Sequence, residues 1–81
     1  MSNQEIAIRT AIATANETIN EKLPQIAENA IRISVLAAVN DTDSRNEIAI
    51  IQQKNTYLCA SVVRLRLDVA RYETAIERLK N

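Results

Sequence analysis

An apolar pattern repeats every seven residues through residues 44–81, and it constrains the fold more than any other feature of the chain. The pattern runs for five heptads at alternate steps of three and four, with one polar position. Its members are Ile48, Ile51, Asn55, Leu58, Val62, Leu65, Val69, Tyr72, Ile76 and Leu79. Such a stripe predicts a long helix that needs a partner along its whole length.

A second apolar stripe precedes it. Ser2 and Glu5 form a capping box, in which Ser2 accepts from a first-turn amide and Glu5 reaches back, so a helix is expected over residues 3–39. Its stripe consists of Ile8, Ile12, Ala15, Ile19, Leu23, Ile26, Ala30, Ile33 and Ala37, with one additional four-residue step before Leu23. Pro24 removes a helical hydrogen bond, which predicts a kink or a break near this residue.

A cluster of turn-forming residues separates the two stripes at residues 40–43. Behind it, Ser44 and Glu47 form another capping box, so the second helix is expected over residues 44–80. A link of about four residues requires the two helices to lie antiparallel and adjacent.

The two stripes stay in register along the whole hairpin. Residues that face each other across an antiparallel pair should have numbers with a constant sum. The sum is 84 for Ile33 with Ile51, Ile26 with Leu58, Ile19 with Leu65, Ile12 with Tyr72, and Ile8 with Ile76. It is 85 for Ala37 with Ile48, Ala30 with Asn55, and Leu23 with Val62. Two separate patterns therefore indicate one geometry.

The composition supports an all-helical fold. The 81 residues suffice for one small domain, and they include no Gly, Trp, Phe or His. The absence of glycine argues against β-sandwich and α/β folds that need glycine turns. The predicted fold class is all-α: a long antiparallel two-helix hairpin, coiled-coil-like, that forms a single domain over residues 1–81. We expect it to dimerise into a four-helix bundle or to join a larger helical assembly.

Several large apolar residues fall outside both stripes and gather toward the turn. Residues 30–39 are apolar apart from Arg32 and Ser34, and Ile50 lies beside them across the hairpin. Exposed clusters of this kind mark interfaces, whereas scattered surface aliphatics are the alternative interpretation. The sequence predicts an interface for a second copy, with a dimer favoured, or for another protein. Its residues are Ile31, Val35, Leu36, Val39, Ile50, Tyr57, Val63 and Leu67.

A row of arginines gives a second, weaker hypothesis. Arg64, Arg71 and Arg78 recur every seven residues on one face of the second helix. They form a possible anion-binding or nucleic-acid-binding ribbon. The alternative is pairing within the helix, of Arg64 and Arg71 with Asp68 and of Glu77 with Lys80. Ten basic and ten acidic residues cancel, so the net charge of the chain favours neither DNA nor a membrane surface.

Asn55 interrupts the longer stripe. An asparagine at such a position commonly fixes register or oligomeric state. A hydrogen bond to a nearby backbone carbonyl or to water is the other interpretation, and the sequence does not decide between them.

No constellation of residues suited to catalysis is visible. Cys59 has no histidine and no second cysteine for a metal site or a catalytic base, so a half-buried packing role is expected. Asp41 and Asp43 supply too few oxygens for a calcium loop, and no glycine-rich loop exists to hold a phosphate. We expect neither metal nor cofactor, and we interpret the protein as non-enzymatic.

The location of the protein is expected to be the cytoplasm. No apolar run is long enough to cross a membrane, and no signal-peptide pattern opens the chain. A single cysteine suits a reducing compartment. Secretion by a non-classical route remains open.

The heptads and equal arms make the layout similar to that of the Rop-like hairpin dimers, in which two hairpins form a four-helix bundle. That resemblance implies a small nucleic-acid-binding regulator, although no Rop residue role maps onto this chain. Length and layout are also similar to needle subunits and small helical chaperones of type III secretion. Needle subunits usually carry prolines in the turn, and residues 40–43 have none. The expected function is that of a non-catalytic assembly subunit, adaptor, chaperone or inhibitor.

Overall fold

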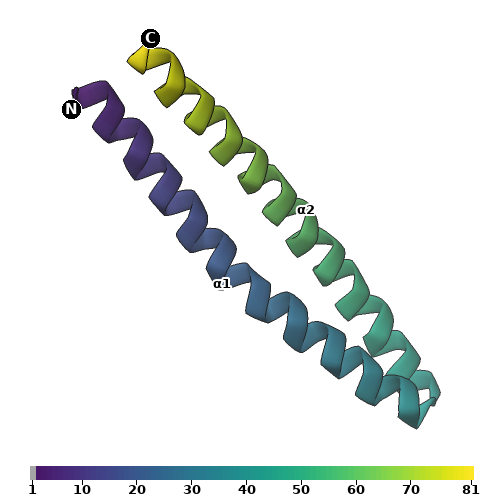
Figure 1. The fold of residues 1–81 in the computed structure, drawn as a ribbon. Coiled ribbons are helices and arrows are strands. Elements are labelled where there is room, and N and C mark those ends of the chain that lie inside the picture. Colours follow the sequence, from purple (N-terminus) through teal and green to yellow (C-terminus); the bar gives the residue numbers. More distant parts are fainter. Residues whose placement is uncertain (1) are drawn as a thin grey trace.

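The computed structural model describes residues 2–81, and two helices account for nearly all of them. Helix α1 spans Asn3–Val39 and helix α2 spans Thr42–Lys80. They lie antiparallel, with both chain ends at one end of the molecule and the link at the other (Figure 1). The Cα atoms extend 60 Å along the hairpin but only 14 and 13 Å across it. The expected all-α hairpin is confirmed.

Helix α1 begins at the predicted cap. The Ser2 hydroxyl accepts a hydrogen bond of 3.1 Å from the Glu5 amide. This bond satisfies one of the free amides of the first turn. The Glu5 carboxylate does not return to the cap. It accepts from Arg9 instead, at 3.0 Å from Nη2.

The link between the helices is shorter than predicted. Asn40 adopts a left-handed conformation with φ 54°, and its amide donates to the Leu36 carbonyl at 3.2 Å. Asparagine tolerates this conformation better than most residues, and it ends α1 as a glycine usually would. Asp41 then caps α2, since its carboxylate accepts from the Ser44 amide at 2.7 Å. The prediction of Ser44 as the cap is wrong, because Asp41 supplies a stronger acceptor three residues earlier.

The stripe of α1 that faces α2 differs from the predicted one after Ile19. The structure keeps strict alternation of four-residue and three-residue steps, so Lys22, Asn29 and Leu36 are half-buried. The predicted members Leu23, Ala30 and Ala37 are exposed, and Leu23 keeps 39 % of its surface accessible. The reason is geometric: α2 repeats every seven residues throughout, and an additional residue in α1 would turn its stripe away from the partner.

A pair of asparagines lies inside the hairpin. Asn29 Nδ2 donates to Asn55 Oδ1 at 2.8 Å, and Asn55 Nδ2 donates to the Ile26 carbonyl at 3.2 Å. The interpretation of Asn55 as a residue that bonds a nearby carbonyl is thus confirmed, with a second amide added to it. The numbers of the two asparagines sum to 84, the constant that the flanking apolar pairs obey. The polar layer therefore continues the register of the seam, by which we mean the two stripes that face each other.

Pro24 does not break α1, which continues through it from Asn3 to Val39. The ring is exposed on the outer side of the hairpin, so the missing backbone bond lies where water reaches the freed carbonyl. Figure 1 shows α1 as one gently curved, uninterrupted helix.

The core of the hairpin is thin. Among residues 2–81, the buried residues are Ala15, Ile19, Ser44, Ile51, Val62 and Ile76. No side chain among them is completely buried. A two-helix hairpin covers one side of each helix and leaves the other to solvent, which sets up the question of what covers the outer sides.

Candidate interaction surfaces

The predicted interface residues near the turn are exposed, with one exception. Ile31, Val35 and Val39 of α1 are 66 %, 60 % and 59 % exposed, and Ile50 of α2 is 55 % exposed. Leu36 is the exception, because it is half-buried in the seam. We call these exposed residues at the turn end the turn patch: Ile31, Val35 and Val39 on α1, and Ile50 on the outer side of α2.

The remaining predicted residues lie further along α2. Tyr57 is 82 % exposed, and Val63 and Leu67 are both 57 % exposed. They point away from the seam. At 100° per residue, all three positions fall on the side of α2 opposite its apolar stripe. Apolar surface therefore continues from the turn patch along the outer side of α2.

One ion pair crosses the hairpin next to the turn patch. Arg32 donates from Nε and Nη2 to the Glu47 carboxylate, and both side chains remain accessible to solvent. An exposed pair of this kind contributes about 0–1 kcal/mol. The pair also defines one broad face of the hairpin, by which we mean a face that both helices border. Arg32 and Glu47 meet on this face.

The arginine row lies on the outer side of α2, and its members have no carboxylate partner among residues 2–81. Within residues 2–81 the ion pairs closer than 4 Å are Arg9 with Glu5 and Arg32 with Glu47. The expected pairs of Arg64 and Arg71 with Asp68, and of Glu77 with Lys80, do not form. The i, i+3 and i, i+4 spacings permit such pairs, but long exposed side chains need not adopt them.

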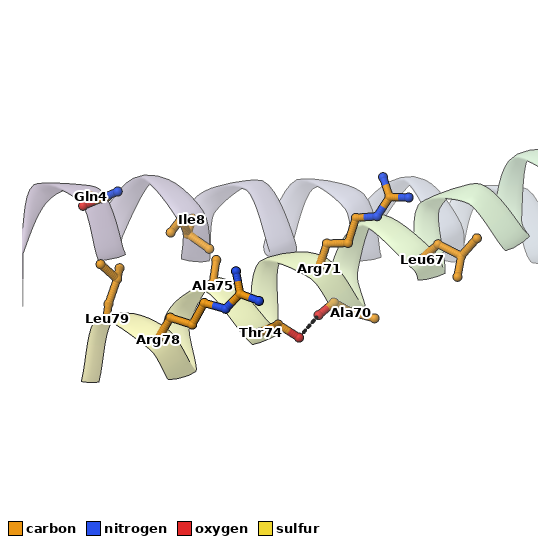
Figure 2. Close-up of a pocket in the computed structure, with 9 residues that line it drawn as sticks. All are labelled: Gln4, Ile8, Leu67, Ala70, Arg71, Thr74, Ala75, Arg78 and Leu79. Carbon is orange, nitrogen blue, oxygen red and sulfur yellow. Dashed lines mark hydrogen bonds between the residues drawn. The ribbon is translucent and has the colours of Figure 1, made fainter. Parts of the chain in front are cut away.

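Two of the arginines border a shallow groove at the end where the chain termini lie. The groove has a volume of about 550 Å³, and its apolar lining comes from Ile8, Leu67, Leu79 and two alanines. Figure 2 shows Arg71 and Arg78 projecting from α2 beside it, with Thr74 between them. The Thr74 hydroxyl donates to the Ala70 carbonyl at 3.0 Å and is thereby occupied. Cations above an apolar floor suit an acidic amphipathic surface.

The residues considered for chemistry remain apart. Cys59 is exposed, not half-buried as expected, because it lies one residue beyond the seam position of Leu58. Nowhere in residues 2–81 do three or more His, Cys, Asp or Glu side chains converge as a metal site would require. Hydrogen bonds from the Ser44 amide and hydroxyl lower the pKa of Asp41, which is the behaviour of a helix cap.

Neither helix, over residues 2–81, is long and apolar enough to span a bilayer. Comparison with known protein families, curated proteins and solved structures gives no match for this chain. The surfaces themselves are thus the ground for a functional proposal.

Proposed function

We propose that the protein is a non-catalytic, cytoplasmic interaction protein that associates with copies of itself and serves as an assembly subunit or adaptor. The observation that carries this proposal is the turn patch. Four large aliphatic side chains near the turn are each more than half exposed, and none of the large side chains in residues 2–81 is completely buried.

The energetics support association. Each square ångström of apolar surface withdrawn from water contributes about 25 cal/mol, so covering the four side chains is worth several kcal/mol. The isolated hairpin has little core from which to draw its stability. Exposed apolar patches on small proteins usually belong to an interface.

The test is the mass of the wild-type protein in solution by light scattering, over a range of concentrations. We expect a mass above the 9.1 kDa of one chain. Ile31→Glu combined with Val35→Glu should bring the mass back to that of one chain without loss of helicity, because both side chains are exposed and outside the seam. A wild type that stays monomeric at about 100 µM contradicts the proposal.

A matched control separates the patch from charge alone. Asn16→Glu combined with Gln52→Glu adds the same two charges at exposed positions outside the patch. This variant should associate like the wild type. If it dissociates equally, general repulsion explains the result and the patch does not.

A second candidate function is nucleic-acid binding by the arginine row. The observation in its favour is that Arg64, Arg71 and Arg78 lack carboxylate partners within the described chain. A gel-shift titration at two salt concentrations tests it, since phosphate contacts make affinity fall steeply with salt. Replacing the three arginines by glutamine should abolish binding, whereas the same change at Arg45, Arg66 and Lys80 should not. Absence of binding at low salt refutes this candidate.

A further inference from the structure

The outer sides of the two helices carry opposite charges. The outer face of α1 consists of the exposed residues met at alternate steps of four and three from Thr10 to Ala38. Its charged members are Glu17, Glu21 and Glu28, and no basic residue lies on it. The outer face of α2 runs likewise from Ile50 to Arg78, and its charged members are the arginine row. One edge of the hairpin is acidic and the other is basic.

These charges are not used within the chain. None of the three glutamates and none of the three arginines belongs to an ion pair closer than 4 Å among residues 2–81. The two edges point away from each other, so one hairpin cannot bring them together. A second copy placed beside the first can.

We infer that the protein associates edge to edge, with the outer face of α1 in one copy docked antiparallel on the outer face of α2 in the next copy. This inference rests on the proposed self-association and specifies its geometry. Charge complementarity and the apolar residues at the turn end of both faces argue for a second copy as the occupant.

The spacing of the charges fixes the offset between copies. Glu21 and Glu28 are seven residues apart, as are Arg64 and Arg71. Both pairs form at once when Glu28 faces Arg64 and Glu21 faces Arg71, where the residue numbers sum to 92. Val35 and Tyr57 have the same sum and meet in the same alignment. Since the seam within a chain has a sum of 84, neighbouring copies are displaced by eight residues, about 12 Å.

The broad faces of the hairpin argue against a closed four-helix bundle. In a closed four-helix bundle, the residues beside the seam become part of the buried interior. On one broad face these positions include Lys54 and Asp68, which border shallow grooves between the helices. On the other they include Arg66 and Glu73, both exposed. Burying such unpaired charges costs several kcal/mol each. Edge-to-edge docking leaves all four in water.

An edge-to-edge contact joins two different surfaces, so each added copy presents a free edge for another. The expected product is a row of hairpins that grows with concentration, not a dimer of fixed mass.

Paired charge reversals test this geometry. Glu21→Arg with Glu28→Arg makes both edges basic, and Arg64→Glu with Arg71→Glu makes both acidic. Each variant alone should fall to the monomer mass in light scattering, and an equimolar mixture should regain the wild-type mass. Arg66→Glu with Lys80→Glu alters the charge equally at exposed positions off the edges, and it should associate normally.

The outcomes separate this inference from the proposal beneath it. A monomeric wild type defeats both. A wild type that associates while the two reversed variants associate equally well overturns the edge-to-edge geometry and leaves self-association standing. Failure of the mixture to recover also overturns it, because complementary edges are then insufficient.

Disulfide trapping tests the offset. In a Cys59→Ser background, a Val35→Cys protein is mixed with a Tyr57→Cys protein or with an Ile50→Cys protein. The displacement of eight residues predicts faster cross-linking with Tyr57→Cys. Preferential cross-linking with Ile50→Cys would mean that neighbouring copies lie level, and would overturn the displacement.

Discussion

Asn29 and Asn55 are the residues whose loss tests the interior most directly. Each amide satisfies the other in a partly buried layer, with the Ile26 carbonyl as a third member. We expect Asn55→Leu to destabilise the hairpin by about 1–3 kcal/mol in urea unfolding, since Asn29 loses its acceptor.

Replacing both asparagines by leucine provides the decisive comparison. The double variant leaves no unpaired amide and should recover the wild-type free energy of unfolding or exceed it. A double variant as unstable as Asn55→Leu would mean that the site does not accept apolar side chains. The broken amide pair would then not explain the loss of stability in Asn55→Leu.

Asp41 gives a prediction in pH. Its hydrogen bonds with Ser44 lower its pKa below the ordinary value of 3.8, so the folded state favours the carboxylate. The stabilisation is therefore present above pH 3.8 and is lost as the pH falls through the folded pKa. Asp41→Ala should lower Tm at neutral pH, and the difference from wild type should disappear in acid. An equal difference at pH 7 and pH 2 would contradict an ionised cap.

At the scale of the helix, Ile19 and Leu23 distinguish the observed stripe of α1 from the alternative stripe that includes Leu23. Ile19 is 6 % exposed and Leu23 is 39 % exposed. Ile19→Ala should cost about 2–4 kcal/mol because it opens a cavity in the seam, and Leu23→Ala should cost clearly less. Chemical denaturation of both variants measures this, and equal losses would place Leu23 inside the seam.

The sequence predicted α2 better than α1 for a physical reason. Every seam position of α2 except Asn55 is apolar, so its frame is unambiguous. In α1, Leu23 and Ala30 are more apolar than their neighbours Lys22 and Asn29. A stripe chosen by hydropathy therefore includes Leu23 and Ala30 and lies one residue away from the observed stripe. The correct frame follows from the strict repeat of the partner helix α2, and the Asn29–Asn55 bond, which joins residues 26 apart in sequence, is formed in that frame. Periodicity within one helix does not contain that information.

The same shift of frame explains why Leu36 was wrongly predicted to belong to the interface. Once the stripe moves by one residue, Leu36 seems to be outside the seam although it is half-buried within it. The other predicted interface residues lie far enough from the seam that either frame leaves them exposed. The sequence could not show that Asp68 forms no ion pair with Arg64 or Arg71, because a spacing of three or four residues permits a surface pair without requiring it.

At the scale of the whole molecule, association should appear in the melting behaviour. Binding between folded copies stabilises the folded state by mass action. Tm should therefore rise over about a hundredfold increase in protein concentration, and the Ile31→Glu, Val35→Glu variant should lose this dependence. A wild-type Tm that is independent of concentration would indicate a hairpin that is stable alone.

The placement of both termini at one end has a mechanical consequence. A force applied between the two ends of the chain pulls α1 and α2 apart at Ile8 and Ile76 first, and each layer of the seam then bears the load in turn. Such a molecule peels open in steps from its open end, while one pulled along its length would have to shear all layers together. The turn, with its left-handed Asn40, is the last part to come under tension.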